Sequence, residues 1–502
     1  MSFVEVPFTG RLGMTFAPGK HQTSKSGGRH ARDLAVDLDR LVAVYGVDEL
    51  VCLLEDRELS ALKIDALVSE AALRGMTVHR LPIPDAGVLP SLEPARALVR
   101  TIIDALNRGR TVVVHCAGGL GRTGTIVGCL LTECGPSVEQ GLSALRAARG
   151  PNCPETQGQK DFIARYSETK SESVAAVAPS VPAKARSSKE DAFSKVVLAA
   201  AIGDAMGHPT EFMSMADIQR QHGESGVTRF ELFWERGTQR FAPYTDDTQM
   251  AEIVLRTLVL ATRRNLDLDS TMRLLAGAFV VWRREPQGGH RAPGNACLSG
   301  AENLASGARW NEAGGVTAGG CGSVMRAYPF GLMFSHDLDR AETWAVEHSK
   351  LTHRDPIALA ACAAMAVGVA QAVNGRPSLA ICSAMIAAAD RYSRQTSTMM
   401  GDAFSDAVNR VPPSVTLDRL RGFAAHEAVA ATLYIFARHE DDPRAAILEG
   451  ANTPGDSDSL ATLAGALVAA RPNAAPLPAE WVRDVERSEA LGALGMRAAR
   501  SV

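Results

Sequence analysis

The sequence predicts a multidomain protein that joins an N-terminal α/β domain, with a central parallel sheet flanked by helices, to a C-terminal all-α domain. Three observations predict this. At 502 residues the chain is longer than one hydrophobic core normally serves. Strand and helix patterns alternate in the first part, whereas the last part is rich in Ala, Leu and Met at helical spacing. Between these parts the composition changes abruptly.

The alternating part contains helical patterns separated by short apolar runs. Strands separated by helices of this length are typical of a parallel α/β sheet. The expected strands cover residues 49–55, 77–83 and 111–116, and the expected helices cover residues 34–47, 63–76 and 94–109.

A flexible linker is predicted at residues 167–191, where the composition changes. This segment consists mainly of Ser, Ala, Pro, Lys and Glu and has no aromatic residue, so it buries too little surface to order itself. Pro179 and Pro182 disfavour the alternative of an exposed helix. We therefore expect domains at residues 1–166 and 192–502.

Composition excludes several classes of protein. The net charge of −3 gives no overall attraction to nucleic acid or to an anionic membrane, and no basic stripe with interleaved aromatics is present. The nine cysteines include no CxxC pair, so neither a disulfide framework nor a zinc site is indicated. The N-terminus lacks a signal-like apolar run, and the apolar stretches, of about a dozen residues, are judged too short to span a bilayer. We expect a cytoplasmic protein without membrane or nucleic-acid partners.

The segment VVVHCAGGLGRTG predicts a nucleophilic site. An apolar strand ends at His115, a glycine-rich loop follows, and a helix opens near Arg122. The loop amides and the helix dipole suit a phosphate dianion and favour the thiolate form of Cys116, which makes it a nucleophile. Arg122 can bind two phosphate oxygens with its fork. Thr123 can offer its hydroxyl to the departing thiolate.

Such a reaction also needs an acid that protonates the leaving oxygen, and Asp85 in LPIPDAGVLP is the candidate. The structural alternative makes Cys116 a core cysteine and Asp85 a turn former beside Gly87. A cysteine alone would favour that alternative, but the glycines, Arg122 and Thr123 together favour the catalytic interpretation.

HCAGGLGRTG matches the protein tyrosine phosphatase signature HCxxGxxR[ST], and DAGVLPS and LRAARGPNCPETQGQKDFI extend the resemblance to the kinase-associated branch of the dual-specificity phosphatases, over roughly Gly10 to Tyr166. The resemblance implies a phosphoester hydrolase that needs no cofactor. It implies that Asp85 is the general acid and that Gln159 orients the hydrolytic water. The phosphate-binding loop would comprise Ala117, Gly118, Gly119, Leu120 and Gly121.

Two clusters of hydroxyls and carboxylates open apolar helices in the last part, in TDDTQMAEIVLRTLVLA and GDSDSLATLAGALVAA. Helix capping explains one such residue per helix, but each cluster has three or more. A surplus of hard oxygen ligands without His or Cys suits Mg²⁺ or Mn²⁺. Two such helix starts facing each other could hold a pair of ions about 3.5–4 Å apart.

These clusters, together with AIGDAMGHPTEF, GGCGSVMRAYPFG and LTHRDP, resemble the ADP-ribosylglycohydrolase family, an all-α fold, over about Phe193 to Arg471. The resemblance implies a catalytic glutamate seven residues after Asp204, which is Glu211, as an acid/base or gating ligand. It implies metal ligands at Thr245, Asp246, Asp247, Asp456, Asp458 and Ser459.

The resemblance also places the loop GGCGSVMR against the ribose and phosphates of ADP-ribose, and the candidate contacts are Gly320, Cys321, Gly322 and Ser323. Cys321 stands where many members have asparagine. His353 has two interpretations, a pocket residue or a structural histidine near Asp355. The stretch from Arg291 to Asn295 is either a pocket-rim loop or an ordinary one.

We therefore predict a bifunctional hydrolase: a phosphomonoester phosphatase tethered to a metal-dependent enzyme that cleaves an N- or O-glycosidic bond to ADP-ribose. Its expected partners are phosphorylated and ADP-ribosylated protein substrates. Two alternatives remain, an interaction or immunity protein that binds and neutralises an ADP-ribosyltransferase, and a hydrolase of a small phosphorylated metabolite related to ADP-ribose.

Overall fold

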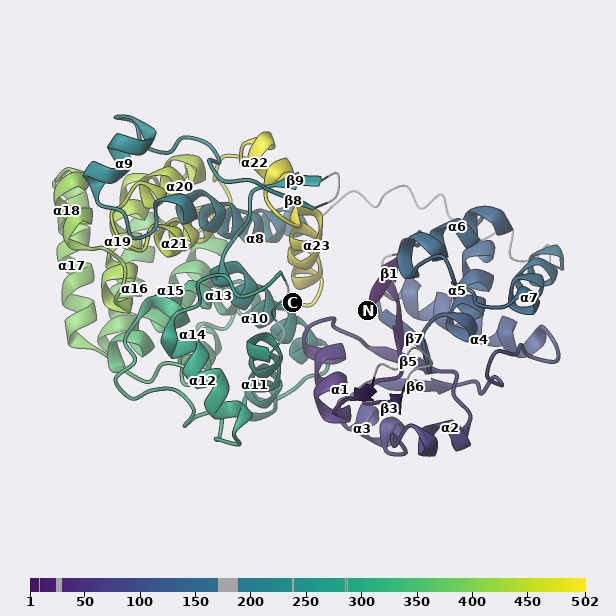
Figure 1. Cartoon of the computed structure of the whole chain (residues 1–502). Coiled ribbons are helices and arrows are strands. Elements are labelled where there is room, and N and C mark those ends of the chain that lie inside the picture. The colour runs from purple at the N-terminus through teal and green to yellow at the C-terminus, as the bar shows by residue number, and fades with distance from the viewer. Residues whose placement is uncertain (9, 24–28, 170–187, 237–238, 285, 287) are drawn as a thin grey trace. The chain divides into compact units, whose positions relative to one another are not determined.

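The computed structural model describes all residues except 9, 24–28, 170–187, 237–238, 285 and 287, and contains two compact units, Met1–Ala185 and Arg186–Val502 (Figure 1). The predicted linker falls largely on residues 170–187, which lie outside the described residues. Helix α7 (Gln157–Glu168) ends before this segment and helix α8 (Ser188–Gly207) begins after it.

The first unit has a five-stranded sheet in the order β1-β2-β7-β5-β6. Strands β7, β5 and β6 are parallel, as predicted, and β2, which was not predicted, is parallel to β7; β1 pairs antiparallel with β2, so the sheet is mixed. The strands are β1 (Ser2–Val4), β2 (Arg11–Phe16), β5 (Glu49–Cys52), β6 (Thr77–Arg80) and β7 (Thr111–Cys116), and β3 (His21–Thr23) pairs with β4 (Arg29–Ala31) apart from them.

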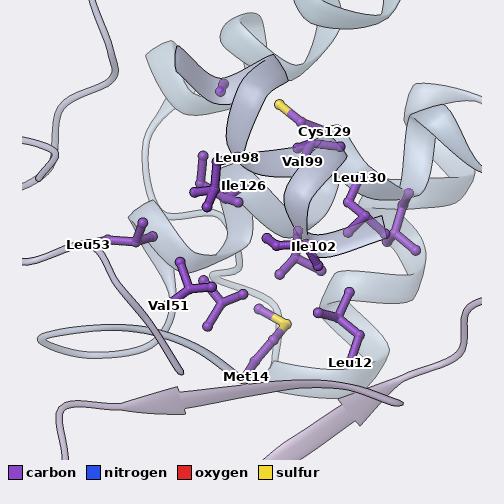
Figure 2. Packing of buried hydrophobic residues seen from close by; sticks show 14 of the residues in the cluster. Leu12, Met14, Val51, Leu53, Leu98, Val99, Ile102, Ile126, Cys129 and Leu130 are labelled. Atoms are coloured by element: carbon purple, nitrogen blue, oxygen red, sulfur yellow. The ribbon is translucent and has the colours of Figure 1, made fainter. Parts of the chain in front are cut away.

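Helices α4 and α5 pack on this sheet to form the core shown in Figure 2. Helix α4 carries Leu98 and Ile102 one turn apart, and both belong to the cluster of buried side chains that also contains Leu12, Met14 and Val51 of the strands. Each such buried side chain contributes about 1.5–3 kcal/mol of transfer free energy. The helices of this unit are α1 (Leu34–Ala43), α2 (Asp56–Ala61), α3 (Leu67–Leu73), α4 (Glu93–Asn107), α5 (Gly121–Glu133), α6 (Val138–Arg149) and α7.

The second unit is helical, as predicted, apart from two short antiparallel strands, β8 (Trp234–Arg236) and β9 (Gln239–Phe241). Two 3-10 turns, η1 (His208–Thr210) and η2 (Cys321–Arg326), accompany its helices. After α8 these are α9 (Met215–His222), α10 (Asp246–Arg263), α11 (Leu268–Arg284), α12 (Asn295–Ala305), α13 (Tyr328–Met333), α14 (Leu338–Ser349), α15 (Pro356–Val373), α16 (Ser378–Asp390), α17 (Arg394–Val408), α18 (Pro413–Arg419), α19 (Ala425–Arg438), α20 (Pro443–Ala451), α21 (Ser457–Ala469), α22 (Ala479–Asp484) and α23 (Ser488–Ala499).

Helices α8 and α21 approach each other closely at the centre of this unit, because glycines line the contact. A Cβ at Gly203 would lie 2.3 Å from the carbonyl oxygen of Ala461, and one at Gly207 would lie 2.5 Å from the Cα of Asp458. No other residue fits at these positions without displacing backbone. The close approach brings the end of α8 next to the start of α21.

Helix α15 corrects one prediction. Its 18 residues have a mean hydropathy of 1.9, which satisfies the length and composition of a membrane-spanning helix, so the expectation that every apolar stretch is too short was wrong. The alanine-rich pattern continues past Val367 without a charged residue. In the structure 72% of the segment is buried inside the unit, as for the core helix of a packed bundle.

Candidate active sites

The first site lies where β7 ends and α5 begins, as the sequence predicted. Cys116 is the last residue of β7 and is 2% exposed, and its Sγ accepts a hydrogen bond from the Gly119 amide at 3.2 Å. Gly119 has φ of +71°, and a Cβ there would lie 2.3 Å from the carbonyl oxygen of Thr15. The loop therefore requires a glycine at this position to curl around the sulfur.

Arg122 lies on the first turn of α5 and is buried, with 2% of its surface exposed. Its guanidinium donates to both carboxylate oxygens of Glu58, at 2.7 and 2.8 Å, to the carbonyl of Ile83 at 2.9 Å and to Asp85 Oδ1 at 2.9 Å. Burial acts to raise the pKa of Glu58, but the hydrogen bonds from Arg122 and from the Glu55 amide, together with the charges of Arg122 and Arg57, outweigh burial and lower the pKa. Glu58 thus fixes the arginine, a role that the sequence analysis missed.

Asp85 lies in a turn, as the structural alternative proposed, and also contacts the site. The Gly87 amide donates to the carbonyl of Pro84 at 2.9 Å, and the side chain of Asp85 is 78% exposed while it accepts from Arg122. The Gln159 Nε2 donates to the carbonyl of Gly87 at 3.3 Å. Asp85 therefore lies between solvent and the arginine, and its role as general acid stays a prediction.

Gln159 is fully buried at the start of α7, and its amide is used within the protein. Its Oε1 accepts from the backbone amides of Glu155 and Thr156, each at 3.1 Å. Together with the contact to Gly87, these bonds join the start of α7 to the turn that carries Asp85. Gln159 therefore stabilises the position of that turn.

The remaining loop residues have partners outside the signature segment. The carbonyl of Leu120 accepts from Cys153 Sγ at 3.3 Å, and the amide of Gly121 donates to Glu155 Oε2 at 3.0 Å. Thr123 Oγ1 is buried and has no hydrogen-bond partner among the described residues. Its hydroxyl is thus unused in the resting site. The carbonyls of Ala117, Gly118 and Gly119 accept from basic side chains considered below.

We expect Asp85→Asn to lower kcat/KM for an alkyl phosphate by about 100-fold and for p-nitrophenyl phosphate by less than tenfold, because a good leaving group needs no proton. Steady-state kinetics on the two substrates measure this difference. Asp56→Asn is the matched control, since Asp56 is an exposed aspartate that pairs with Arg80. Equal losses of kcat/KM on both substrates would show that Asp85 only stabilises the turn.

The second site begins at α10. Thr245 is its N-cap and accepts from the Asp247 amide at 3.3 Å. Asp204, fully buried in α8, accepts from the Thr245 amide at 2.8 Å and from the hydroxyl of Thr248 at 2.6 Å. These bonds fix the position of Asp246 and Asp247, which are 5% and 4% exposed.

A hydrogen bond links the starts of α10 and α21, the two helices that the sequence predicted to carry the clusters. Ser459 Oγ, on the first turn of α21, donates to Asp247 Oδ2 at 2.9 Å. Asp456 occupies the N-cap position of α21, yet its side chain makes no capping hydrogen bond. Capping therefore accounts for Thr245 at α10 but not for Asp456 at α21, whereas Asp458 accepts from the Ser459 amide at 2.9 Å.

Glu211 and Asp458 also meet, because α8 and α21 are in contact. Ligand atoms of His208, Glu211 and Asp458 all lie within 4.8 Å of one another. Asp246, Asp247 and Asp456 do not belong to this group of three, and His208 was not predicted. The sequence feature that could have indicated His208 is its place in GDAMGHPTEF, one turn before Glu211.

The acidic side chains share one electrostatic environment. Burial raises the pKa of Asp246, Asp247 and Asp456 well above the ordinary value, and the charge of Asp458 raises each of them further. The same two causes raise the pKa of Asp204 to about 6. Carboxylates buried at this density need compensation, either by protons, as the raised pKa values indicate, or by a cation. The donor set of carboxylate and hydroxyl oxygens therefore fits a hard divalent ion.

The loop GGCGSVMR lies close to these carboxylates. Gly320 pairs with Ala424, and the amide of Cys321 donates to the carbonyl of Phe423 at 3.1 Å. Burial raises the pKa of the Cys321 thiol, and the charges of Asp456 and Asp247 raise it further. Cys321 therefore lies near the acidic cluster, and its predicted contact with ADP-ribose stays a prediction.

Ser323 and His353 are both buried in the second unit. Ser323 is fully buried and accepts from the hydroxyl of Ser349 at 2.9 Å. His353 is 2% exposed, and its Nδ1 lies 2.8 Å from Thr352 Oγ1, which accepts from Arg326 at 2.6 Å. The other ring nitrogen, Nε2, lies near the loop, since a Cβ at Gly322 would be 3.4 Å from it. Asp355 does not contact this histidine but caps α15.

Arg291 is buried in an ion pair with Glu486 and donates to the carbonyl of Tyr244 at 2.7 Å. Its own carbonyl accepts from the Asp246 amide at 3.2 Å. Arg291 therefore supports the start of α10 from inside the unit, and its side chain does not line a pocket rim.

We expect Mg²⁺ to raise the melting temperature of the full-length chain by about 5 °C at 100 times Kd, and by less at pH 5 than at pH 8. The raised pKa values mean that the folded cluster binds more protons than the unfolded chain. Without metal, stability is therefore present at low pH and is lost as pH rises through the raised values. Protons therefore compete with the cation more strongly at pH 5 than at pH 8. Calorimetry, with NaCl at equal ionic strength as control, measures the shift. The same rise in melting temperature at both pH values would contradict the binding of Mg²⁺ at these carboxylates.

Comparison with known proteins identifies both parts of the chain. Residues 185–502 match the family "ADP-ribosylglycohydrolase", and residues 32–136 match "Polymorphic toxin system, DSP-PTPase phosphatase". The second part is 24% identical over 298 residues to ADP-ribosyl-[dinitrogen reductase] glycohydrolase of Rhodospirillum rubrum, covering 58% of this chain and 88% of that protein. It is 27% identical over 300 residues to ADP-ribosylarginine hydrolase Tri1 of Pseudomonas putida, covering 58% and 74%.

The first part is 27% identical over 137 residues to cyclin-dependent kinase inhibitor 3 of Mus musculus, covering 27% of this chain. The match spans 64% of the length of that relative.

Proposed function

This chain belongs to the ADP-ribosylglycohydrolase family and carries a phosphatase domain of the DSP-PTPase type before it, and from this we propose that it is a bifunctional hydrolase. One site hydrolyses a phosphomonoester and the other releases ADP-ribose from a modified protein. The observation that carries the proposal is that each unit has its own cluster of reactive side chains: Cys116 with Arg122 in the first, and Asp458 with Glu211 in the second.

In the first site, the Cys116 thiolate attacks phosphorus and the leaving oxygen takes a proton from Asp85. The Asp85 carboxylate then accepts a proton from the water that hydrolyses the phosphocysteine. Arg122 binds phosphate oxygens once substrate competes with Glu58 and Asp85 for its donors. The buried hydroxyl of Thr123 is available to the thiolate as it departs.

In the second site, Asp246, Asp247, Asp456 and Asp458, with the hydroxyls of Thr245 and Ser459, would hold two Mg²⁺ or Mn²⁺ ions. Such ions orient the ribose hydroxyls and supply an activated water. Glu211 then holds or donates a proton at the glycosidic bond, and burial together with the charge of Asp458 raises its pKa, as an acid requires. The names of the glycohydrolase relatives favour ADP-ribosylarginine as the bond that is cleaved.

Mass spectrometry of the products tests this function directly. The full-length chain is incubated with an ADP-ribosylarginine peptide, an ADP-ribosylserine peptide and a phosphotyrosine peptide, in Mg²⁺. We expect free ADP-ribose from the arginine peptide and inorganic phosphate from the phosphopeptide. Release of neither product, although both units are folded, would contradict the proposal and favour a binding protein.

A further inference from the structure

Two basic side chains from outside the signature segment contact the phosphate loop. Lys20 Nζ donates to the carbonyl of Ala117 at 3.2 Å. Arg149, at the end of α6, donates through Nε to the carbonyl of Gly119 at 3.1 Å and through Nη2 to that of Gly118 at 3.2 Å. The loop therefore lies between two cations in addition to Arg122.

The sheet explains why Lys20 reaches the loop. Strands β2 and β7 are parallel neighbours, with Phe16 opposite Cys116, so the chain that leaves β2 runs beside the loop that leaves β7. Ala17 continues this pairing, since its amide donates to the carbonyl of Ala117 at 3.4 Å. Lys20 follows directly and is 7% exposed, with its ammonium group held at the loop.

The charge on these two groups is not balanced by a carboxylate. In the described part of the chain, neither Lys20 nor Arg149 forms an ion pair, whereas neighbouring Arg32 is paired with Asp37 at 2.6 Å. Burial lowers the pKa of Lys20 and the charge of Cys116 raises it. In their hydrogen bonds to the loop carbonyls, Lys20 uses one of its three N–H donors and Arg149 uses two of its five. The other donors are available to a ligand.

On the premise of the proposed phosphatase function, we propose that Lys20 and Arg149 form a second anion subsite beside the phosphate loop, so that the preferred substrate carries a second phosphate group next to the one that is hydrolysed. An ammonium and a guanidinium fork together match the charge and geometry of a phosphate dianion. The second phosphate binds and is not transferred, because the two side chains contact carbonyls of the loop and not the Cys116 sulfur. A small bisphosphate and a doubly phosphorylated peptide both provide this chemistry.

The test compares kcat/KM of the full-length chain on two matched pairs of substrates. One pair is inositol 4-phosphate and inositol 4,5-bisphosphate. The other is a phosphotyrosine peptide and the same peptide with phosphothreonine two residues earlier. We expect a preference for the doubly phosphorylated member of one pair of at least about tenfold, which corresponds to about 1.4 kcal/mol. The pair that shows it identifies the source of the second phosphate, and ratios near one in both pairs would overturn the subsite.

Variants separate the subsite from a merely structural role. Lys20→Met and, independently, Arg149→Gln should bring the preference toward one, whereas Lys20→Arg should keep most of it. Arg146→Gln is the matched control, because Arg146 is an exposed arginine one turn earlier on α6. Equal losses on both members of a pair, with the ratio unchanged, would show that these residues only brace the loop. Hydrolysis of none of the four substrates would instead refute the phosphatase function on which the inference rests.

Discussion

Replacing Cys116 with serine is expected to lower kcat/KM for p-nitrophenyl phosphate by at least about 10⁴-fold and to leave ADP-ribose release unchanged. The reason is that the loop amides and Arg122 are arranged around the Cys116 sulfur, which accepts the Gly119 amide at 3.2 Å. A serine hydroxyl keeps its proton at neutral pH and is therefore a much weaker nucleophile than a thiolate.

Cys153→Ser is the matched control. Cys153 is also a buried cysteine at the loop, and it donates to the carbonyl of Leu120, but burial raises the pKa of its thiol to about 11. It is therefore a protonated packing residue at neutral pH, and its serine variant should retain phosphatase activity. Retained activity in Cys116→Ser, or equal loss in both variants, would contradict the assignment of the nucleophile.

Replacing Asp458 with asparagine is expected to lower ADP-ribose release by about 10³-fold, comparable to the loss of a major electrostatic group in an active site. Asp458 is the residue that meets Glu211 and His208, and its charge raises the pKa of the three other predicted aspartate ligands. The variant should also lose most of the Mg²⁺-dependent rise in melting temperature.

Asp442→Asn is the control for this variant. Asp442 caps α20 by accepting from the Ala445 amide at 3.0 Å, so its replacement removes a genuine cap without touching the cluster. If the carboxylates at α21 were only caps, Asp442→Asn and Asp458→Asn would behave alike. An Asp458→Asn variant that keeps its activity would refute the metal interpretation.

The sequence predicted the parts of both sites that are local in the chain. Strand, loop and helix from Val112 to Arg122 are continuous, so the fixed spacing of Cys116 and Arg122 already determines how they meet. The clusters at α10 and α21 are likewise local, because hydroxyls and carboxylates in one helical turn share one place in space.

Residues that reach the sites through tertiary packing could not be predicted. Lys20 depends on β2 lying beside β7, and β2 was missed because its six residues include Gly13, which weakens a strand pattern. Glu58 lies 64 residues before Arg122. His208 meets Asp458 only because glycines let α8 approach α21.

We propose that this one chain contains two independent active sites and that only the glycohydrolase site needs a metal. The most direct measurement follows free ADP-ribose and inorganic phosphate together, from an ADP-ribosylarginine peptide and p-nitrophenyl phosphate incubated with the full-length protein, before and after EDTA and then with excess Mg²⁺. We predict that EDTA stops ADP-ribose release while phosphate release continues, and that Mg²⁺ restores the first activity. ADP-ribose release that persists in EDTA, or the loss of both products together, would contradict the account.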